Sequence, residues 1–178
     1  MSREINDSDL GTLTHDGDAV ALTFVRRLAH PVDKVWRAVS ETEHLAAWFP
    51  HEIVGERRAG ASLRFVSSGG DGFDGEMLVF DPPKVMELMW GTDRLRIELQ
   101  PDGDGTVLTL TDTFHELGKA ARDAGGWHEC LDRLRADLDG VDPGAWGAHW
   151  REINAVYIER LGPEAATIGP PPGWEPGG

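Results

Sequence analysis

The segment that spans residues 27–49 restricts the possible folds more than any other part of the chain. Pro31 predicts a helix start, because proline suits the first helical position, and Asp33 lies in the first turn, where the helix dipole favours an anion. Apolar side chains then recur at helical spacing, at Val32, Val35, Trp36 and Val39. Residues 40–43, Ser-Glu-Thr-Glu, have the form of a capping box that opens a second short helix. The pattern predicts a strand that leads into two short helices.

Seven segments have the composition of β-strands. They lie at about residues 19–28, 51–57, 61–67, 73–80, 84–90, 93–100 and 105–113. The connectors between the later strands are short and rich in glycine, aspartate and proline, which predicts successive antiparallel hairpins. In the segment 93–100, Leu95, Ile97 and Leu99 alternate with charged residues. One face of the sheet is therefore apolar and needs a cover.

A helix over residues 119–138 is the predicted cover. Its apolar side chains follow one stripe, at Trp127, Cys130, Leu131, Leu134 and Leu138. Gly140 and Pro143 predict where it ends. Gly125 and Gly126 mark either its start or a place where bare backbone passes close to another element.

The remaining segments flank a single domain, which we assign to residues 19–140. Residues 1–18 are polar and acidic, and we expect a flexible lead or an edge extension of the sheet. Residues 144–162 predict an appended amphipathic helix, and residues 163–178 a disordered tail rich in proline and glycine. The stripe of the appended helix consists of Trp146, Trp150, Ile153, Tyr157 and Leu161. We expect the chain's own domain to cover this stripe, although a symmetric homodimer would bury the same surface.

The charge balance restricts the partners of the protein. Thirty-one acidic residues against 17 basic residues give a net charge of −14, which repels phosphate backbones and anionic lipid surfaces. We therefore expect no nucleic-acid and no membrane partner. The amino terminus lacks the apolar core of a signal peptide, and the single cysteine, Cys130, fits a reducing compartment. These features predict a cytoplasmic protein, either a monomer or a homodimer.

Four segments of the chain, in order, resemble one protein family. They are residues 27–49, 75–83, 84–90 and 126–134. The family is the activator-of-heat-shock-protein-90-ATPase-homologue-like family (C-terminal-domain type) of the START/SRPBCC superfamily, and the resemblance covers about residues 20–140. It implies an α+β helix-grip (Bet v-like) fold, in which a curved antiparallel sheet of six to seven strands wraps around a long C-terminal helix. Because one fold hosts many activities, the resemblance predicts the fold more strongly than the function.

The helix-grip fold implies a cavity between the sheet and the long helix. The side chains expected to line it and to bind a ligand are Trp36, Trp48, Phe49, Phe65, Phe73, Met77, Met86, Leu88, Trp90, Trp127 and Leu131. The alternative is that they close a dry core, because aromatic residues dominate cores as well as pockets. The leading hypothesis is a non-catalytic binding protein that carries, sequesters or senses a small hydrophobic or amphipathic ligand.

Two other functions follow from the resemblance. The domain surface could contact a chaperone and modulate its ATPase, which would connect the protein to the stress response. The protein could also be an enzyme, such as a cyclase or hydrolase, as some relatives in the superfamily are.

The sequence predicts no catalytic residue, no metal site and no cofactor. The titratable groups near predicted strand ends or the long helix are His51, Glu76, Glu87, His115 and His128. We expect solvated or structural roles for them, with Glu87 facing solvent and His51 near the mouth of the cavity. The spacing of the histidines, the single cysteine and the absence of nucleophile or glycine-rich phosphate motifs favour this interpretation.

Overall fold

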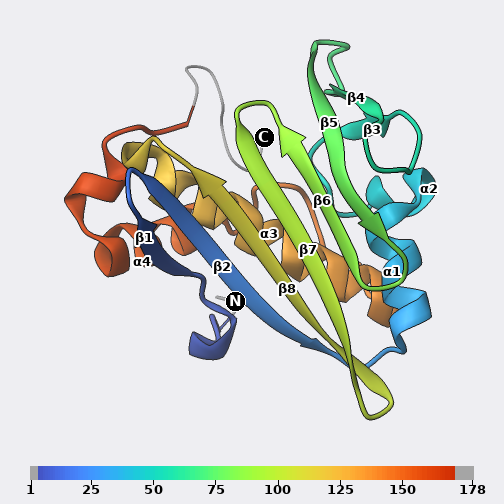
Figure 1. Ribbon diagram of the computed structural model, residues 1–178. Helices are drawn as coiled ribbons and strands as arrows, with labels where there is room; N and C mark the ends of the chain where they lie inside the picture. The colour runs from blue at the N-terminus through green and yellow to red at the C-terminus, as the bar shows by residue number, and fades with distance from the viewer. Residues whose placement is uncertain (1–3, 171–178) are drawn as a thin grey trace.

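An eight-stranded antiparallel sheet forms the body of the molecule, in the order β1-β2-β8-β7-β6-β5-β4-β3 (Figure 1). The computed structural model describes residues 4–170. The strands are β1 (Thr12–Asp16), β2 (Ala19–Leu28), β3 (Glu52–Val54), β4 (Ser62–Val66), β5 (Gly72–Asp81), β6 (Val85–Trp90), β7 (Asp93–Asp102) and β8 (Gly105–Phe114). From β3 to β8 each strand pairs with the next along the chain, which confirms the predicted meander.

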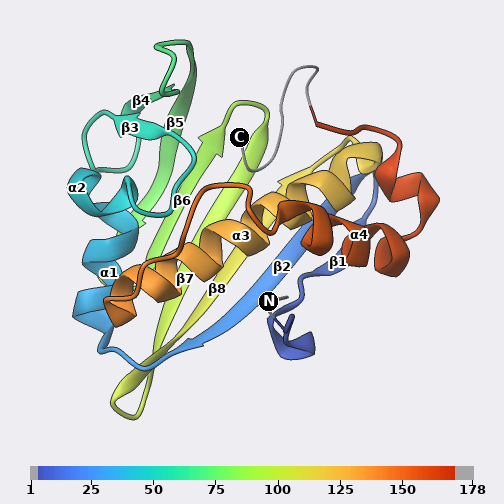
Figure 2. The same cartoon turned by 180° about the vertical axis from the view of Figure 1, so that it is seen from behind.

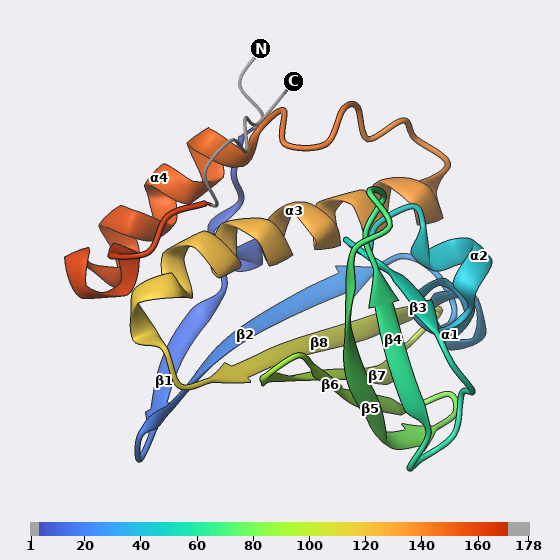
Figure 3. The ribbon, with the colours of Figure 1, turned by 90° about the horizontal axis from the view of Figure 1, so that it is seen from above.

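One long helix, α3, lies against the concave face of the curved sheet (Figures 2 and 3). The helices are α1 (Val32–Ser40), α2 (Thr42–Leu45), α3 (Ala120–Asp139) and α4 (Trp150–Leu161), with short 3-10 turns η1 (Asp7–Asp9), η2 (Leu117–Lys119) and η3 (Pro163–Ala166). α1 and α2 lie near the end of α3, and α4 packs beside its first half (Figure 2). The helix-grip arrangement expected from the resemblance is confirmed.

The inward faces of the strands follow the predicted alternation. Ile97 pairs with Leu110 and Leu99 with Leu108 across β7 and β8, and all four side chains are buried. Burying such aliphatic side chains against α3 stabilises the fold by about 1.5–3 kcal/mol each. The core is thus the space between the sheet and α3.

The two short helices form, but the predicted capping box does not. Ser40 closes α1 instead of opening α2, because its hydroxyl donates a hydrogen bond to the Trp36 carbonyl (2.7 Å). Glu41 precedes α2 and makes no side-chain cap. After α2 the chain turns inward, and the Trp48 indole donates to the Ala38 carbonyl at 2.9 Å. The aromatic pair at the end of this segment is therefore anchored in the core.

One of the two glycines inside α3, Gly125, allows a close approach of α4. The helix continues through Gly125 and Gly126 and ends at Gly140, whose φ of 69° lies in the left-handed region. A Cβ on Gly125 would lie 3.2 Å from Trp150 Nε1 and 3.5 Å from the Cα of Asn154. Of the two alternatives, the structure shows close passage of another element at Gly125, whereas a Cβ on Gly126 would meet nothing within 4 Å.

The amino-terminal segment is not simply a flexible lead. β1 pairs with β2 from Thr12↔Thr23 to Asp16↔Ala19, after a turn at Gly17 with a φ of 62°. The edge extension is therefore the correct alternative for these residues, and the sheet has eight strands rather than six to seven. The sequence pattern did not predict β1, because this edge strand buries little and therefore lacks a clear alternation of apolar and polar side chains.

The appended helix starts later than predicted, at Trp150 instead of residue 144. Gly144 and Gly147 have φ values of 78° and 76°, which a right-handed helix cannot contain. Trp146 therefore lies outside the helix and is 43% exposed, whereas Trp150, Ile153 and Tyr157 are buried within the chain.

Part of the predicted disordered tail is packed. Residues 163–166 form η3, in which Ala165 is buried, and the Ile168 amide donates to the Gly118 carbonyl at 2.9 Å. Pro163 favours a helical first turn, and the run rich in proline and glycine begins only at Gly169. Residues 171–178 lie outside the described part of the chain.

Candidate functional site

A pocket of about 710 Å³ lies where the sheet, α3 and the segments that flank α4 meet. Its wall is mainly aromatic and apolar, with four tryptophans and a few polar groups. The lining residues are Pro50, His51, Ser67, Trp90, Arg122, Asp123, Gly126, Trp127, Glu129, Cys130, Trp146, Trp150 and Pro170. This volume falls within the range of about 300–1,000 Å³ that is typical of small-molecule sites.

Aromatic rings connect the pocket with the core. The ring centroids of Trp90 and Trp127 are 5.1 Å apart, and Phe49 lies 5.7 Å from Trp127 and 6.3 Å from Trp90. Phe73 continues the contact at 5.8 Å from Trp90, followed by Phe65, which stacks on Phe73 at 5.1 Å. The pocket wall is therefore the outer end of a packed aromatic cluster.

The structure places the predicted ligand-binding residues in three environments. Trp90 and Trp127 line the pocket, and Trp36 lines a second space of about 650 Å³ between α1, α2 and β5. The others belong to the continuous core or pack against it: Trp48, Phe49, Phe65, Phe73, Met77, Met86, Leu88 and Leu131. These eight side chains pack together in the core, and the pocket occupies one end of the space between sheet and helix.

Trp127 is oriented by a buried carboxylate that sequence reasoning missed. Its indole Nε1 donates to Asp112 Oδ2 at 2.9 Å, and Asp112 is fully buried on β8. Among the described residues, Asp112 Oδ1 has no hydrogen-bond partner. Burial, with the neighbouring charge of Asp93, raises the pKa of Asp112 to about 7. The available signal was its register, since Asp112 follows Leu108 and Leu110 on the inward face of its strand.

Lys119 compensates the acidic groups around Asp112. Its ammonium forms an ion pair with Asp93 and lies 3.4 Å from Asp123. Arg122 donates from Nε to Asp123 Oδ1 at 2.8 Å. The carboxylate of Asp123, which lines the pocket, is thus paired with two cations.

Glu129 contributes a second carboxylate to the pocket wall, from the middle of α3. Its Oε1 accepts a hydrogen bond from the Gly147 amide at 2.6 Å, and burial raises its pKa. Cys130 also lines the pocket, but burial raises the pKa of its thiol, so the thiolate form that reacts or binds metal is disfavoured.

His51 lies at the pocket as expected, next to two aromatic rings. Its ring centroid is 5.6 Å from Trp90 and 5.2 Å from Phe73, and burial lowers its pKa, which favours the neutral imidazole. Two buried nitrogens, His51 Nδ1 and Trp90 Nε1, have no hydrogen-bond partner within residues 4–170.

The other titratable candidates lie away from the pocket. His128 is buried beneath α4, where its Nδ1 shares a 2.9 Å hydrogen bond with the Tyr157 hydroxyl, and burial lowers its pKa to about 4. Glu87 does not simply face solvent, because its side chain is only 14% exposed and binds Arg96 at 2.8 Å. Glu76 and His115 are exposed. These positions fit structural or solvated roles.

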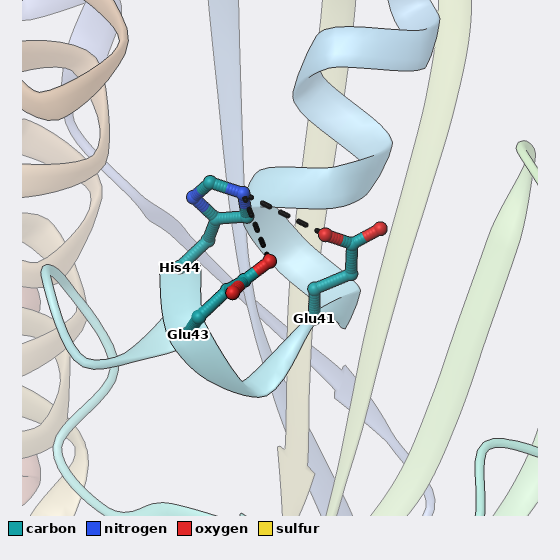
Figure 4. Close-up of side chains that lie close together, drawn as sticks. All are labelled: Glu41, Glu43 and His44. Carbon is teal, nitrogen blue, oxygen red and sulfur yellow. Dashed lines mark ion pairs between the residues drawn. The ribbon is translucent and has the colours of Figure 1, made fainter.

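Within residues 4–170, two groups of side chains have the spacing of metal ligands, although the sequence did not indicate a metal site. Figure 4 shows the first, in which His44 Nε2 lies 3.6 Å from Glu41 and 3.9 Å from Glu43. Its two glutamates are exposed, and their contacts with His44 are ordinary surface ion pairs. The second group is Asp93, Asp112 and Asp123, where the Lys119 ammonium already supplies a positive charge.

A curved antiparallel sheet that holds a long helix, with an aromatic pocket at one end, defines a helix-grip protein of the SRPBCC superfamily. The model of the family described as "Activator of Hsp90 ATPase homolog 1-like protein" matches residues 29–139, and the chain belongs to this family. No match was found among curated proteins. Within residues 4–170, no helix has both the length and the apolar character needed to cross a membrane.

Solved structures share the fold at low sequence identity. EF2215, a conserved protein of unknown function from Enterococcus faecalis, is 22% identical with a TM-score of 0.72, over 85% of this chain and 90% of the other. CalU16 from Micromonospora echinospora is 24% identical with a TM-score of 0.67, over 84% and 92%. A Bordetella parapertussis protein is 24% identical with a TM-score of 0.65, over 90% and 95%.

Proposed function

We propose that the protein binds a small apolar or amphipathic molecule in the 710 Å³ pocket, as a carrier or sensor. The observation that carries this proposal is the pocket wall itself, where Trp90 and Trp127 face the space beside His51. Trp90 remains partly exposed although its ring is held by Phe49, Phe73 and Trp127. An apolar ligand that covers this partly exposed aromatic wall removes apolar surface from water, which favours binding.

The geometry gives Asp112 a positioning role and not a catalytic one. Asp112 has the pKa of a general acid or base, but it is fully buried behind the Trp127 indole and does not line the pocket. A catalytic acid or base must come within hydrogen-bond reach of the reacting atoms. Asp112 therefore acts on the pocket through Trp127, as a positioning residue.

Binding is tested by titrating the protein with an environment-sensitive apolar dye. We expect saturable uptake by the full-length protein and at least a tenfold weaker affinity for Trp90→Ala, because that variant removes the ring at the centre of the wall. The matched control is Phe80→Ala, which alters the second space near α1 and α2 and should leave the affinity unchanged. Equal loss in both variants, or no saturable uptake by the folded wild-type protein, would contradict the proposal.

A further inference from the structure

The charged groups of the pocket wall are unequally compensated. Arg122 and Asp123 form an ion pair at 2.8 Å, and Lys119 lies 3.4 Å from the same carboxylate. Lys119 also pairs with Asp93, so the two cations face two carboxylates, Asp93 and Asp123. His51 adds no positive charge, because its burial favours the neutral ring.

Glu129 is different, because its carboxylate forms no ion pair with any residue in the described part of the chain. It accepts one hydrogen bond, from the Gly147 amide. Of the nearby basic residues, Arg133 and His149, Arg133 is engaged elsewhere, because its guanidinium stacks 4.0 Å from the Trp146 ring centroid. Arg133 also donates to the Ala47 carbonyl at 3.3 Å and to the Gly144 carbonyl at 3.0 Å. Glu129 is therefore a half-buried carboxylate with capacity for a further partner.

The charge of Glu129 discriminates between ligand classes. A neutral apolar ligand would remove the remaining water from this carboxylate without replacing its hydrogen bonds, which is unfavourable. An anionic ligand would meet the same carboxylate and a chain of net charge −14. A cation would replace the lost water with an ion pair, and the faces of the surrounding tryptophans attract cations.

We propose that the pocket selects a cationic amphiphile, with an apolar or aromatic body against Trp90 and Trp127 and an ammonium or amidinium group at the Glu129 carboxylate. This inference rests on the proposed function, because it names the ligand class of the same pocket. The apolar wall would provide most of the affinity, and Glu129 would provide the preference for a cation. Among the lining residues, Glu129 is suited to this role because Asp123 is already paired.

The test compares three probes of one shape and different charge, measured by isothermal titration calorimetry on the full-length protein at neutral pH. The probes are naphthylmethylamine, which is protonated, naphthylmethanol, which is neutral, and naphthylacetate, which is anionic. We expect the amine to bind about tenfold tighter than the alcohol, and the acetate to bind weakest. Glu129→Gln should abolish the preference for the amine while the affinity for the alcohol stays the same or increases.

The matched control is Asp137→Asn, which makes the same change in net charge at an exposed position of the same helix and should preserve the preference. An amine that binds wild-type protein no tighter than the alcohol would overturn the inference and leave the proposed function intact. A preference that persists in Glu129→Gln would also overturn it. Failure of all three probes to bind the folded wild-type protein would count against the proposed function itself. The wild-type ranking needs no variant, so the test does not depend on Glu129→Gln folding.

Discussion

At position 112 the chain places a carboxylate where the pattern of its strand calls for an aliphatic side chain. Asp112 shares the inward face of β8 with Leu108, Leu110 and Phe114, and it has no exposed surface. Burying an ionisable group is unfavourable, and the single hydrogen bond from Trp127 offsets only part of the cost. The orientation of a pocket tryptophan is the benefit that the structure shows.

The cost of Asp112 should appear as a dependence of stability on pH. Its pKa is raised from the ordinary 3.8 to about 7, so ionisation is penalised in the folded state. The penalty is absent below about pH 4, grows between pH 4 and pH 7, and is complete above pH 7, with a slope of at most about 1.4 kcal/mol per pH unit. Asp112→Asn removes the ionisation, so the variant should gain stability over wild type as the pH rises. Urea unfolding at pH 5 and pH 8 measures this difference, and an equal difference at both values would contradict it.

The sequence predicted the core residues well and this polar residue not at all. Leu134 and Leu108 follow periodicities that burial enforces, and both are buried. Asp112 shares the inward register of Leu108 and Leu110, but an isolated aspartate in a strand is ordinarily read as a surface residue. Its role depends on Trp127, which approaches from a helix 15 positions further along the chain. Contacts of this kind follow from the packing of elements and cannot be read from local spacing.

At the scale of the elements, Tyr157 of α4 contacts three segments that are distant from it in sequence: the residue before β1, β2 and α3. Its hydroxyl accepts a hydrogen bond from the Gly11 amide at 2.9 Å and shares another with His128 of α3. The ring also meets Phe24 of β2 at 6.4 Å. Through Tyr157, α4 therefore connects the residue before β1 with α3.

Removing this hydroxyl should loosen the amino-terminal edge of the sheet. In Tyr157→Phe the buried Gly11 amide and the His128 ring lose their partner, which should cost about 1–3 kcal/mol in the free energy of unfolding. We expect the variant to have a lower denaturant midpoint than wild type. Its amide exchange should be accelerated more in β1 than in β7. Ile158→Ala changes an exposed neighbour on the same helix and should stay within about 0.5 kcal/mol. Similar exchange rates for β1 in the variant and wild type would contradict the assigned role.

The element boundaries show where local patterns lose their predictive power. α3 was predicted to within a residue or two, because a long amphipathic stripe with a glycine stop is a strong signal. The start of α4 was wrong by six residues, because Trp146 matched the apolar stripe while Gly147 broke the helix. β1 was not predicted as a strand, since it buries little and is held by its pairing with β2.

At the scale of the whole molecule, the apolar face of α4 is buried within one chain. This face consists of Trp150, Ile153 and Tyr157, which are all buried. Gly125 has no side chain, so α4 can approach α3 closely at this point. Deleting residues 143–178 should uncover this surface, lower the stability and promote association of the truncated chain. Sedimentation should show a monomer of about 19.5 kDa for the intact protein and larger species for the truncation. A truncated protein that stays monomeric and equally stable would show that α4 is dispensable.

The pocket itself was only partly predictable from sequence. The resemblance implied a cavity between sheet and helix lined by eleven side chains; of these, Trp90 and Trp127 line the pocket, next to His51. Trp146 and Trp150 were assigned to a separate stripe, yet they complete the same wall, because the chain returns over α3 after Gly140. The path of such a return is set by tertiary packing.

The concentration of indoles in this wall makes the protein its own optical reporter. Four of the six tryptophans in the described part of the chain line the pocket, and one of them, Trp127, is hydrogen-bonded to Asp112, whose pKa is raised to about 7. Occupancy of the pocket and ionisation of Asp112 should therefore both be visible in the intrinsic emission, without any attached label. Ligand discovery for this chain can begin from the ultraviolet spectrum of the unmodified protein.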